Sequence, residues 1–303
     1  MNLKDIEYIV KIAEEGNVTR AAEKLFLTPS ALTQQLLHLE RELNMPLFYR
    51  SRTGWTLTEG GAVYLEAARE MLRLKRETYS RLQDIASIKH GSLSIGFPPE
   101  RGTSMFTNVY PDFHREYPDI TINVHEVSVH RQQQMISQGN LDIGFLSLME
   151  SQRTDDEYLF IAKEEIVLAV PSGHPLCNEA VFFGNGPYPE LDLAKLRYEP
   201  FALMYKESTI RELVDALFRQ AGFVPAVLFE TSRTNTILSM VSARLCCGLI
   251  SESYCSQSFP GVSIFSLPGH PTWNLVASYR KKGYLSKPAR RFIELAANYW
   301  KNE

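Results

Sequence analysis

Apolar residues recur every three or four positions through the N-terminal part of the chain, which predicts a series of short helices. One apolar stripe covers residues 3–13, and a short helix is expected at 20–26 with Thr19 as its cap. A third helix is expected over residues 29–43. Two short helices joined by a tight turn, the second with polar residues facing outward, predict a helix-turn-helix.

The third helix is strongly amphipathic. Thr28 is placed to cap it, and Pro29 falls at the first helical position, where its missing N–H costs nothing. Its leucines fall within an arc of ~60°, and Ser30, Gln34 and the flanking Thr33 lie on other sides. In a recognition helix, glutamine can pair with adenine N6 and N7, and hydroxyls can bond base edges or phosphates. A plain amphipathic surface helix would show the same pattern.

The segment after this helix, residues 46–61, predicts a two-stranded wing. Arg50 and Arg52 alternate with polar residues, and Gly54 makes the turn. Arginines in a wing neutralise phosphates or enter the minor groove, although solvated loop arginines are the simpler alternative. The candidate DNA-binding residues are Thr28, Pro29, Ser30, Thr33, Gln34, His38, Arg50, Arg52 and Thr53.

A long amphipathic helix follows the wing, with Thr58 as its cap and Glu59 in its first turn. About 30 residues of helix span ~45 Å, which is too long for a small winged domain to cover alone. The apolar stripe therefore predicts a partner helix, and a second copy of the same chain is the economical choice. The alternative is a helix that lies on its own protein. The domain boundary is expected near residues 89 and 90.

The remaining two-thirds of the chain alternate between strand-like and helix-like segments, which predicts parallel βαβ units with helices on both faces of a sheet. The segments form two similar α/β halves, so we expect two subdomains with a cleft between them. Strands are expected at 93–97, 121–127, 141–146, 164–171, 201–204, 227–231, 248–251, 262–267 and 273–280, and helices at 103–116, after Ser128, at 208–221, 234–245 and 287–300.

The composition of the chain argues against some classes of protein but does not identify a function. The chain has 303 residues, 44% of them hydrophobic, and a net charge of −3, which argues against wholesale coating of nucleic acid. No apolar run approaches the ~20 residues needed to span a bilayer, and the N-terminus does not read as a signal peptide. The four cysteines form no metal-binding spacing, so we expect a reduced, cytoplasmic protein.

The N-terminal pattern resembles the LysR-type transcriptional regulators. The resemblance rests on NVTRAAEKLFLTPSALTQQLLHLERELNMPLFYRSRTGWTLTEGG and continues through LSIGF, FHREYPDITINV, QGNLDIGFL and VLAVPSGHPL. It implies an α/β multi-domain protein that binds promoter DNA as a homodimer or homotetramer under control of a small effector, with no cofactor and no catalytic activity. The implied parts are a winged helix-turn-helix at 1–58, a linker helix at 59–89 and an effector domain at 90–303, with subdomain I at about 90–165 and 268–303 and subdomain II at about 166–267.

This chain departs from the family pattern on its recognition helix. The family typically has arginine where this chain has Gln34, and basic residues where it has Leu37 and His38. Residues 1–58 contain seven Lys and Arg against seven Asp and Glu. We therefore expect fewer phosphate contacts from this helix and a larger share from the wing arginines.

The effector site is expected at the carboxyl ends of strands, where helix N-termini attract anions. Plain helix capping is the alternative for each hydroxyl. Lys206 would neutralise an anionic effector or be a solvated surface lysine. The candidate effector-binding residues are Thr103, Ser104, Ser128, His130, Lys206, Ser208, Thr209, Ser232, Thr234 and Asn235.

Three other functions are alternatives to this one. Cys246 and Cys255 are nine positions apart, which suggests a redox switch, although inert core cysteines are the favoured interpretation. The segment that begins at His125 reads HExxxH and is not the HExxH zinc motif. In a strand over 121–127, His125 and Glu126 would also point to opposite faces. A solute-binding or enzymatic cleft protein, whose N-terminal helices serve only assembly, is the third alternative, but no GxSxG, Walker or strand-linked GxGxxG motif is present.

Overall fold

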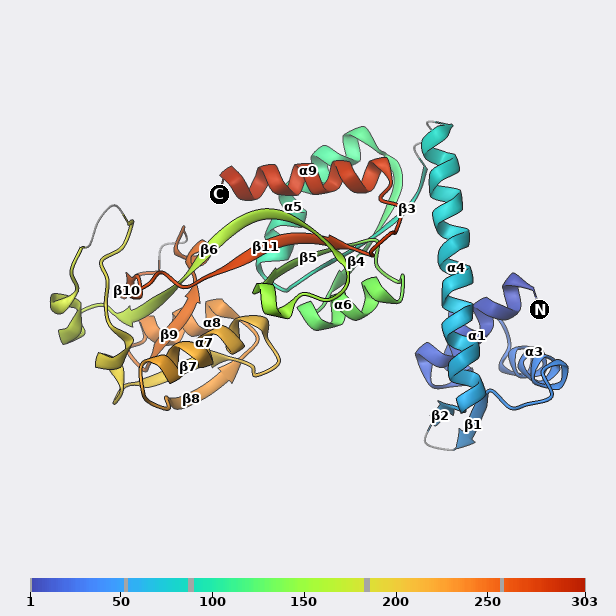
Figure 1. Cartoon of the computed structure of the whole chain (residues 1–303), viewed down its shortest axis with the longest axis horizontal. Helices are drawn as coiled ribbons and strands as arrows, with labels where there is room; N and C mark the ends of the chain where they lie inside the picture. Colours follow the sequence, from blue (N-terminus) through green and yellow to red (C-terminus); the bar gives the residue numbers. More distant parts are fainter. Residues whose placement is uncertain (1, 52–53, 87–89, 183–185, 257–258, 303) are drawn as a thin grey trace. The chain divides into compact units, whose positions relative to one another are not determined.

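The computed structural model describes residues 2–51, 54–86, 90–182, 186–256 and 259–302. The chain forms two compact units, residues 1–88 and 89–303, which are named here the N-terminal unit and the C-terminal unit (Figure 1). The elements of the N-terminal unit are α1 (Leu3–Glu15), α2 (Val18–Lys24), α3 (Pro29–Glu42), β1 (Phe48–Ser51), β2 (Gly54–Leu57) and α4 (Glu59–Ile85).

The helix caps account for most of these boundaries. Thr28 caps α3 as expected, since its Oγ1 accepts the N–H of Ala31 at 3.2 Å. The expected cap of α2 was wrong: Asn17, and not Thr19, caps this helix. The Asn17 side chain reaches two backbone N–H groups of the first turn, at 2.8 and 3.1 Å, which places Thr19 inside the helix.

The core of the N-terminal unit forms where α1, α2 and α3 meet. Ala21 and Ala22 of α2 are fully buried, and their small side chains let the neighbouring helices approach closely. Of the leucine stripe on α3, Leu43 lies just beyond the end of the helix and is 38% exposed. The other three pack into this core, namely Leu32, Leu36 and Leu39.

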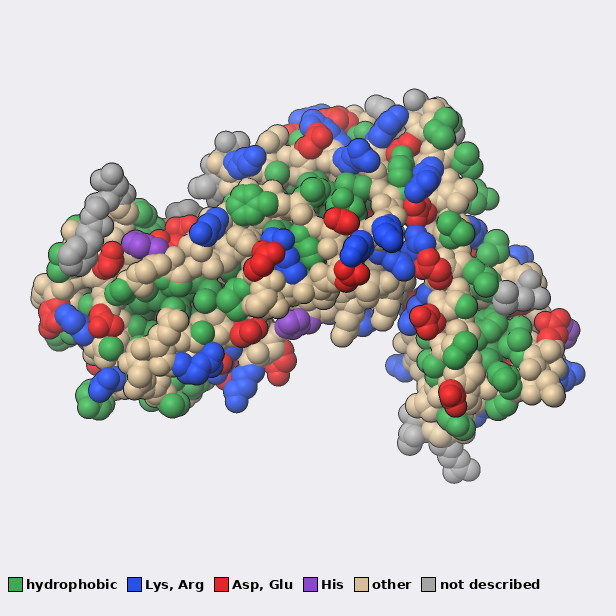
Figure 2. Space-filling view, in the orientation of Figure 1, with side chains coloured by type: hydrophobic (Ala, Val, Ile, Leu, Met, Phe, Trp, Pro, Cys, Tyr) green, Lys and Arg blue, Asp and Glu red, His purple; other side chains and the backbone are tan. Residues whose placement is uncertain are grey.

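The long helix α4 packs on α1 along its first half and is uncovered within the N-terminal unit along its second half. Leu65 and Ala68 are buried against α1, and Lys75 Nζ bonds Glu7 Oε1 of α1 at 2.9 Å. This ion pair explains why the apolar stripe is interrupted at Lys75. Hydrophobic side chains lie on the visible surface along α4 (Figure 2). In the second half of the helix, Leu74, Tyr79, Leu82 and Ile85 are 56–80% exposed.

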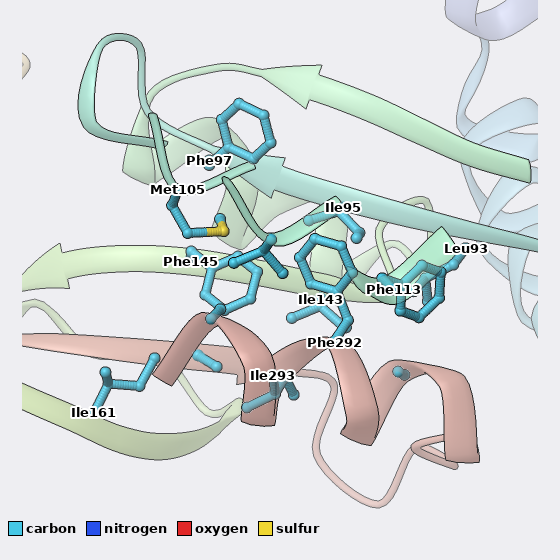
Figure 3. Close-up of a cluster of buried hydrophobic side chains, with 14 of the residues drawn as sticks. Leu93, Ile95, Phe97, Met105, Phe113, Ile143, Phe145, Ile161, Phe292 and Ile293 are labelled. Atoms are coloured by element: carbon cyan, nitrogen blue, oxygen red, sulfur yellow. The ribbon is translucent and has the colours of Figure 1, made fainter. Parts of the chain in front are cut away.

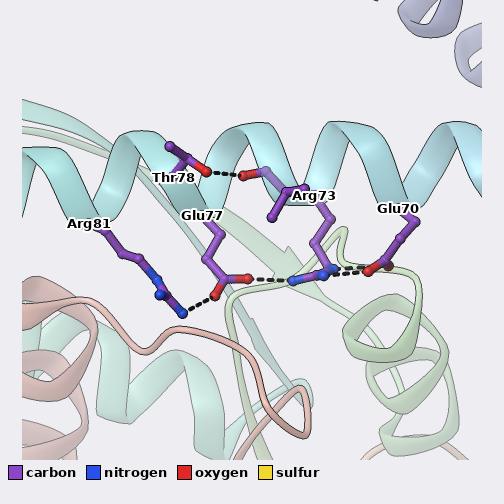
Figure 4. A network of polar contacts seen from close by, with 6 residues as sticks. Glu70, Arg73, Glu77, Thr78 and Arg81 are labelled. Atoms are coloured by element: carbon purple, nitrogen blue, oxygen red, sulfur yellow. Dashed lines mark hydrogen bonds and ion pairs between the residues drawn. The ribbon is translucent and has the colours of Figure 1, made fainter.

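Charged side chains support the uncovered half of α4. Arg73 lies between Glu70 and Glu77, one turn away on either side, and Glu77 also bonds Arg81 at 2.7 Å (Figure 4). The bond to Glu70 is the main cause that raises the pKa of the Arg73 guanidinium. Such pairs stabilise a helix by about 0.2–0.5 kcal/mol each, so this half stays helical without being packed.

The C-terminal unit is built on one mixed sheet in the order β4-β3-β5-β11-β6-β9-β7-β8, with β10 paired to β6. Its elements are β3 (His90–Phe97), α5 (Arg101–Glu116), β4 (Asp119–Glu126), α6 (Val129–Ser137), β5 (Ile143–Leu148), β6 (Glu157–Pro171), β7 (Pro200–Met204), α7 (Thr209–Gln220), β8 (Ala226–Thr231), α8 (Thr234–Ser242), β9 (Cys247–Ser251), β10 (Val262–Phe265), β11 (Thr272–Tyr279) and α9 (Lys287–Asn302), with short 3-10 turns at Glu150–Gln152, Pro175–Glu179, Leu193–Leu196 and Glu252–Ser256.

The expectation of purely parallel units needs correction at the middle of this sheet. Strands β3, β4 and β5 pair in parallel, and so do β7, β8 and β9. The two groups are joined by β11 and the long β6, whose pairings with their neighbours are antiparallel. Strand β6 pairs with β11 along its first part and with β9 and β10 along its second, so it belongs to both halves.

Each half has its own hydrophobic core. In subdomain I, defined here by β3, β4, β5, α5, α6 and α9, Phe292 of α9 packs edge-on against Phe113 of α5 with ring centres 5.2 Å apart (Figure 3). The C-terminal helix therefore returns to the first half. In subdomain II, defined by β7 to β10, α7 and α8, Phe201 and Phe218 pack edge-on at 4.9 Å.

Candidate functional site

The outward face of α3 carries the predicted base-reading residues. Ser30, Gln34 and His38 are exposed, and Thr33 is half-buried. Thr33 Oγ1 donates to the backbone oxygen of Pro29 at 2.7 Å, so this hydroxyl is engaged within its own helix. His38 Nδ1 lies 3.9 Å from a carboxylate oxygen of Glu42. Gln34 and Gln35 are therefore the long polar side chains that the middle of α3 presents to solvent, and Gln34 is the one on the same face as Ser30.

The wing is attached to α3 by a buried carboxylate that the sequence analysis missed. Glu40 is 8% exposed, and its Oε1 accepts the N–H of Leu47 at 2.8 Å. Its Oε2 pairs with Arg50, whose guanidinium also lies over the ring of Trp55 at 5.2 Å from the centroid. The predicted phosphate ligand Arg50 thus already holds a carboxylate, and the predicted ligands Arg52 and Thr53 lie outside the described residues.

Phe26 is a second feature of this surface that the sequence analysis missed. It lies between α2 and α3 and is 95% exposed. Its φ of +55° is in the left-handed region that glycine and asparagine prefer. A strained and exposed aromatic residue beside the N-terminus of α3 points to a contact outside the chain. The signal in the sequence was Phe26 itself, an apolar residue two positions before the cap Thr28, where a turn residue is expected.

The C-terminal unit contains a cavity of about 350 Å³ to which both subdomains contribute. Its walls are largely apolar, with Phe145 and Trp300 from subdomain I, Met204 and Ile210 from subdomain II, and Trp273 from the connecting strand β11. A cavity of this size and character is typical of a small-molecule site. Five predicted effector-binding residues line it, namely Ser128, Ser208, Thr209, Ser232 and Thr234.

A second, more polar hollow of about 420 Å³ shares Glu100, Arg101, Glu126 and Tyr254 with the first. Three further predicted residues line this hollow, namely Thr103, Ser104 and Asn235. The remaining two, His130 and Lys206, are exposed and line neither hollow. The structure thus brings eight of the ten predicted residues to one connected region.

The hydroxyl groups in this region make different contacts. Ser128 caps α6 by accepting the N–H of Arg131 at 3.4 Å, as the capping alternative predicts. Thr209 Oγ1 donates to the Ser147 oxygen at 2.8 Å and so connects the two subdomains. Ser208 stands at the N-cap of α7 but makes no capping bond, and its buried Oγ contacts no polar group within the described part of the chain. Ser208 is therefore available to a ligand.

A buried ion pair that the sequence analysis missed forms part of the cavity wall. Arg101 pairs with Glu164 of β6, and Glu164 Oε2 also accepts from Ser251 Oγ at 2.9 Å and Trp273 Nε1 at 3.1 Å. The Arg101 guanidinium lies 5.5 Å from the ring centre of Trp300. Gly102 permits this arrangement, because a Cβ at this position would be 2.5 Å from Phe97.

Several donor groups in the wall have no partner. Among the described residues, Arg101 Nε and Nη1 and Trp300 Nε1 are buried without a hydrogen-bond partner. The neighbouring acceptors Glu164 and Glu100 already hold donors of the protein. Unpaired buried donors carry a desolvation penalty, which a ligand with acceptor atoms would remove. The lining of the cavity is suited to a largely apolar molecule.

The thiols of the proposed redox pair are protected from ionisation. Burial raises the pKa of Cys246, and it raises that of Cys255 to about 11. Because the thiolate is the reactive form, these values favour inert thiols over a redox switch. Within the described residues, no group of three or more His, Cys, Asp and Glu side chains is placed to hold a metal ion. No described helix is long and apolar enough to cross a membrane.

Comparisons with known families match both units. The family described as "Bacterial regulatory helix-turn-helix protein, lysR family" matches residues 3–62, and the one described as "LysR substrate binding domain" matches residues 87–301. The chain belongs to the LysR family of transcriptional regulators. The resemblance inferred from the N-terminal motif is confirmed, together with the predicted fold of a helix-turn-helix followed by a two-subdomain α/β effector domain. Membership of a family of regulators disfavours the enzymatic and solute-binding alternatives.

Individual relatives are similar to this chain over most of its length. YwbI of Bacillus subtilis, described only as an uncharacterised HTH-type transcriptional regulator, is 30% identical over 302 residues, which cover 99% of this chain and 97% of YwbI. AlsR of the same organism, an HTH-type transcriptional regulator, is 28% identical over 80% of this chain and 78% of AlsR. A full-length OxyR variant of Pseudomonas aeruginosa shares the fold with a TM-score of 0.71 at 22% identity, covering 98% of this chain and 94% of that chain.

Proposed function

We propose that the N-terminal unit binds double-stranded promoter DNA with the outward face of α3 in the major groove. Ser30 and Gln34 read base edges, and His38 lies farther along the same face. Thr28, Pro29 and Thr33 shape the first turns of the helix and bring its N-terminus close to the phosphate backbone. The exposure of Gln34 at the middle of this face is the observation that carries the assignment.

Within this proposal Arg50 positions the wing, and Arg52 and Thr53 make the backbone contacts. The pairing of Arg50 with Glu40 supports this division, because it fixes the wing to the helix that reads the bases. CbnR, a regulator with the same fold, was solved in complex with its target DNA, at 22% identity to this chain and a TM-score of 0.52, over 98% of this chain and 100% of CbnR.

The exposed half of α4 supports assembly of the chain as a homodimer. Its apolar side chains face solvent beyond Lys75, and a second α4 would cover them with the same residues by two-fold symmetry. Two such dimers would form the tetramer. We place the assembly in the cytoplasm, where its DNA partner and a reducing environment are found.

A small effector in the cavity is proposed to control DNA binding. The effector contacts both subdomains, since Ser128 and Ser208 approach the cavity from opposite halves. Binding then favours one arrangement of the subdomains over another and so changes the relative placement of the DNA-binding units within the oligomer. The largely apolar walls of the cavity support a largely apolar effector.

A gel-shift titration with salt tests the DNA-binding proposal. Gln34→Ala is expected to lose about 1–3 kcal/mol of discrimination between target and unrelated DNA, while the dependence on salt stays unchanged. Gln220→Ala, which removes an exposed glutamine at the end of α7, serves as the matched control. The assignment is wrong if Gln34→Ala retains full discrimination, and the whole proposal is wrong if the unmodified chain ignores DNA at low salt.

A further inference from the structure

Glu100 has a backbone conformation that side chains other than glycine rarely adopt. Its φ is +66° and its ψ is −86°, in the loop between β3 and α5. It occupies the N-cap of α5 but makes no capping bond to that helix. Such a conformation persists only where surrounding contacts impose it, and it occurs most often at functional sites. The contact that holds Glu100 is therefore of interest.

That contact crosses from one subdomain to the other. Glu100 Oε2 accepts the backbone N–H of Thr234 at 2.8 Å. Thr234 is the first residue of α8, a nine-residue helix, and the N-cap residue Arg233 makes no side-chain capping bond. The cap of α8 is thus supplied by a carboxylate 134 positions away in the chain. Helix N-termini favour a negative group at this position because of the helix dipole and the exposed N–H groups.

The surroundings of the Glu100 carboxylate are those of a ligand subsite. Glu100 lies at the boundary of the apolar cavity and the polar hollow, and it lines both. Trp300 lines the same cavity and is 94% buried, and its Nε1 contacts no acceptor among the described residues. Arg101, the neighbouring cation, is paired with Glu164 instead of Glu100. Glu100 is therefore held through the helix terminus, and Arg233, the N-cap residue of α8, lines the polar hollow with it.

We propose that Glu100 is a ligand built into the chain: its carboxylate fills a carboxylate subsite at the N-terminus of α8 and connects the two subdomains while no effector is bound. An effector that carries a carboxylate competes for this subsite and displaces Glu100, which releases the strained loop before α5. This inference rests on the proposed control by an effector and adds the chemical class of that effector. The subsite offers a carboxylate one backbone N–H, which Glu100 now accepts at 2.8 Å.

Chemical rescue of the full-length Glu100→Ala variant tests the proposal. Thermal unfolding is followed by tryptophan fluorescence, since Trp273 and Trp300 both line the cavity. We expect Glu100→Ala to unfold at a temperature about 2–4 °C below that of the unmodified chain. Sodium formate is expected to restore at least half of the loss in this variant, and sodium chloride at equal ionic strength to restore none.

Two matched variants make the test specific. Glu207→Ala removes an exposed carboxylate that lines the same cavity, and we expect no formate rescue there. Glu100→Gly also removes the carboxylate but accepts the positive φ without strain, so it separates the lost bond from the backbone conformation. It is expected to gain stability in formate, as Glu100→Ala does.

The proposal is overturned if Glu100→Ala unfolds at the unmodified temperature, if formate stabilises all the proteins equally, or if chloride replaces formate. None of these readouts involves DNA. Failure of the unmodified chain to bind DNA would therefore overturn the proposed function separately.

Discussion

The proposed DNA-binding surface and the proposed effector cavity are assembled in different ways. The face of α3 presents Ser30, Gln34 and His38 from one continuous helix, so their spacing along the chain fixes their positions in space. The cavity takes Arg101, Trp273 and Trp300 from three distant segments, and the connecting strands bring them together. A substitution on the first surface should change recognition alone, whereas one in the cavity should also change the stability of the unit.

The largest expected effect is on the cavity side. Glu164→Leu leaves Arg101 buried without its partner, which should lower the free energy of unfolding by about 3–5 kcal/mol. The double variant Arg101→Met with Glu164→Leu replaces both charges and should recover most of this loss. Urea unfolding, followed by tryptophan fluorescence, measures the free energy of unfolding of the single and the double variant. Equal loss in the single and double variants would show that the charge pair is not the cause.

Glu40 tests whether the DNA-binding surface also depends on one tertiary contact. Glu40→Ala removes the acceptor for the N–H of Leu47 and the partner of Arg50, with an expected loss of about 2 kcal/mol in the free energy of unfolding. DNA affinity should fall as well, because the wing loses its attachment to α3. Glu66→Ala, which removes an exposed carboxylate of α4, is the control in both urea unfolding and gel shifts. Undiminished DNA affinity in Glu40→Ala would contradict this account of the wing.

Substitution of Phe26 should change the stability of the N-terminal unit and its DNA affinity in opposite directions. Phe26→Gly relieves a positive φ and is expected to raise the free energy of unfolding by up to about 1 kcal/mol. If the exposed ring contacts DNA, the same variant binds target DNA more weakly despite its greater stability. A parallel measurement of urea unfolding and DNA affinity checks this. Unchanged affinity would leave Phe26 as a strained turn residue without a role in binding.

The smallest expected effect is a pH dependence within the C-terminal unit. His270 lies 3.0 Å from Glu165 and 3.3 Å from Glu190, and its bond to Glu165 is the main cause that raises its pKa above 6.5. The stabilisation is fully present below pH 6.5 and is lost as the pH rises through the higher pKa of the folded state. It should stay below about 1 kcal/mol, because the side chain is 43% exposed. His270→Ala should abolish this pH dependence in thermal unfolding measured between pH 6 and 8.

The local pattern of hydrophobic residues was enough to predict most helices and strands of this chain. The periods of three to four and of two residues placed α1, α3, α4 and the strands of both halves close to their observed positions. Capping rules placed Thr28 and Thr58 at the starts of their helices. Asn17 was missed because Thr19, another residue that can cap a helix, stands two positions later. Strand β6 is longer than expected because its first half is made of polar and apolar residues without a clear alternation.

The candidate site could be predicted only as a region. The rule that ligands lie at the carboxyl ends of strands selected Ser208 and Thr234, which line the cavity between the subdomains. The same rule included Lys206 and His130, since it does not say which way a side chain points. Arg101 and Glu164 were missed because neither shows a local signal, and their significance follows from their pairing across 63 positions of the chain.

The sequence by itself determined the element types, the helix-turn-helix and the polar face of α3, because these depend on residues a few positions apart. Tertiary structure alone decided that Arg50 holds Glu40, that Arg101 holds Glu164 and that Glu100 caps α8. It also decided that the strands joining the two halves are antiparallel. The physical reason is that a buried charge takes whichever partner the folded chain brings within reach, and that distance is unrelated to separation along the sequence.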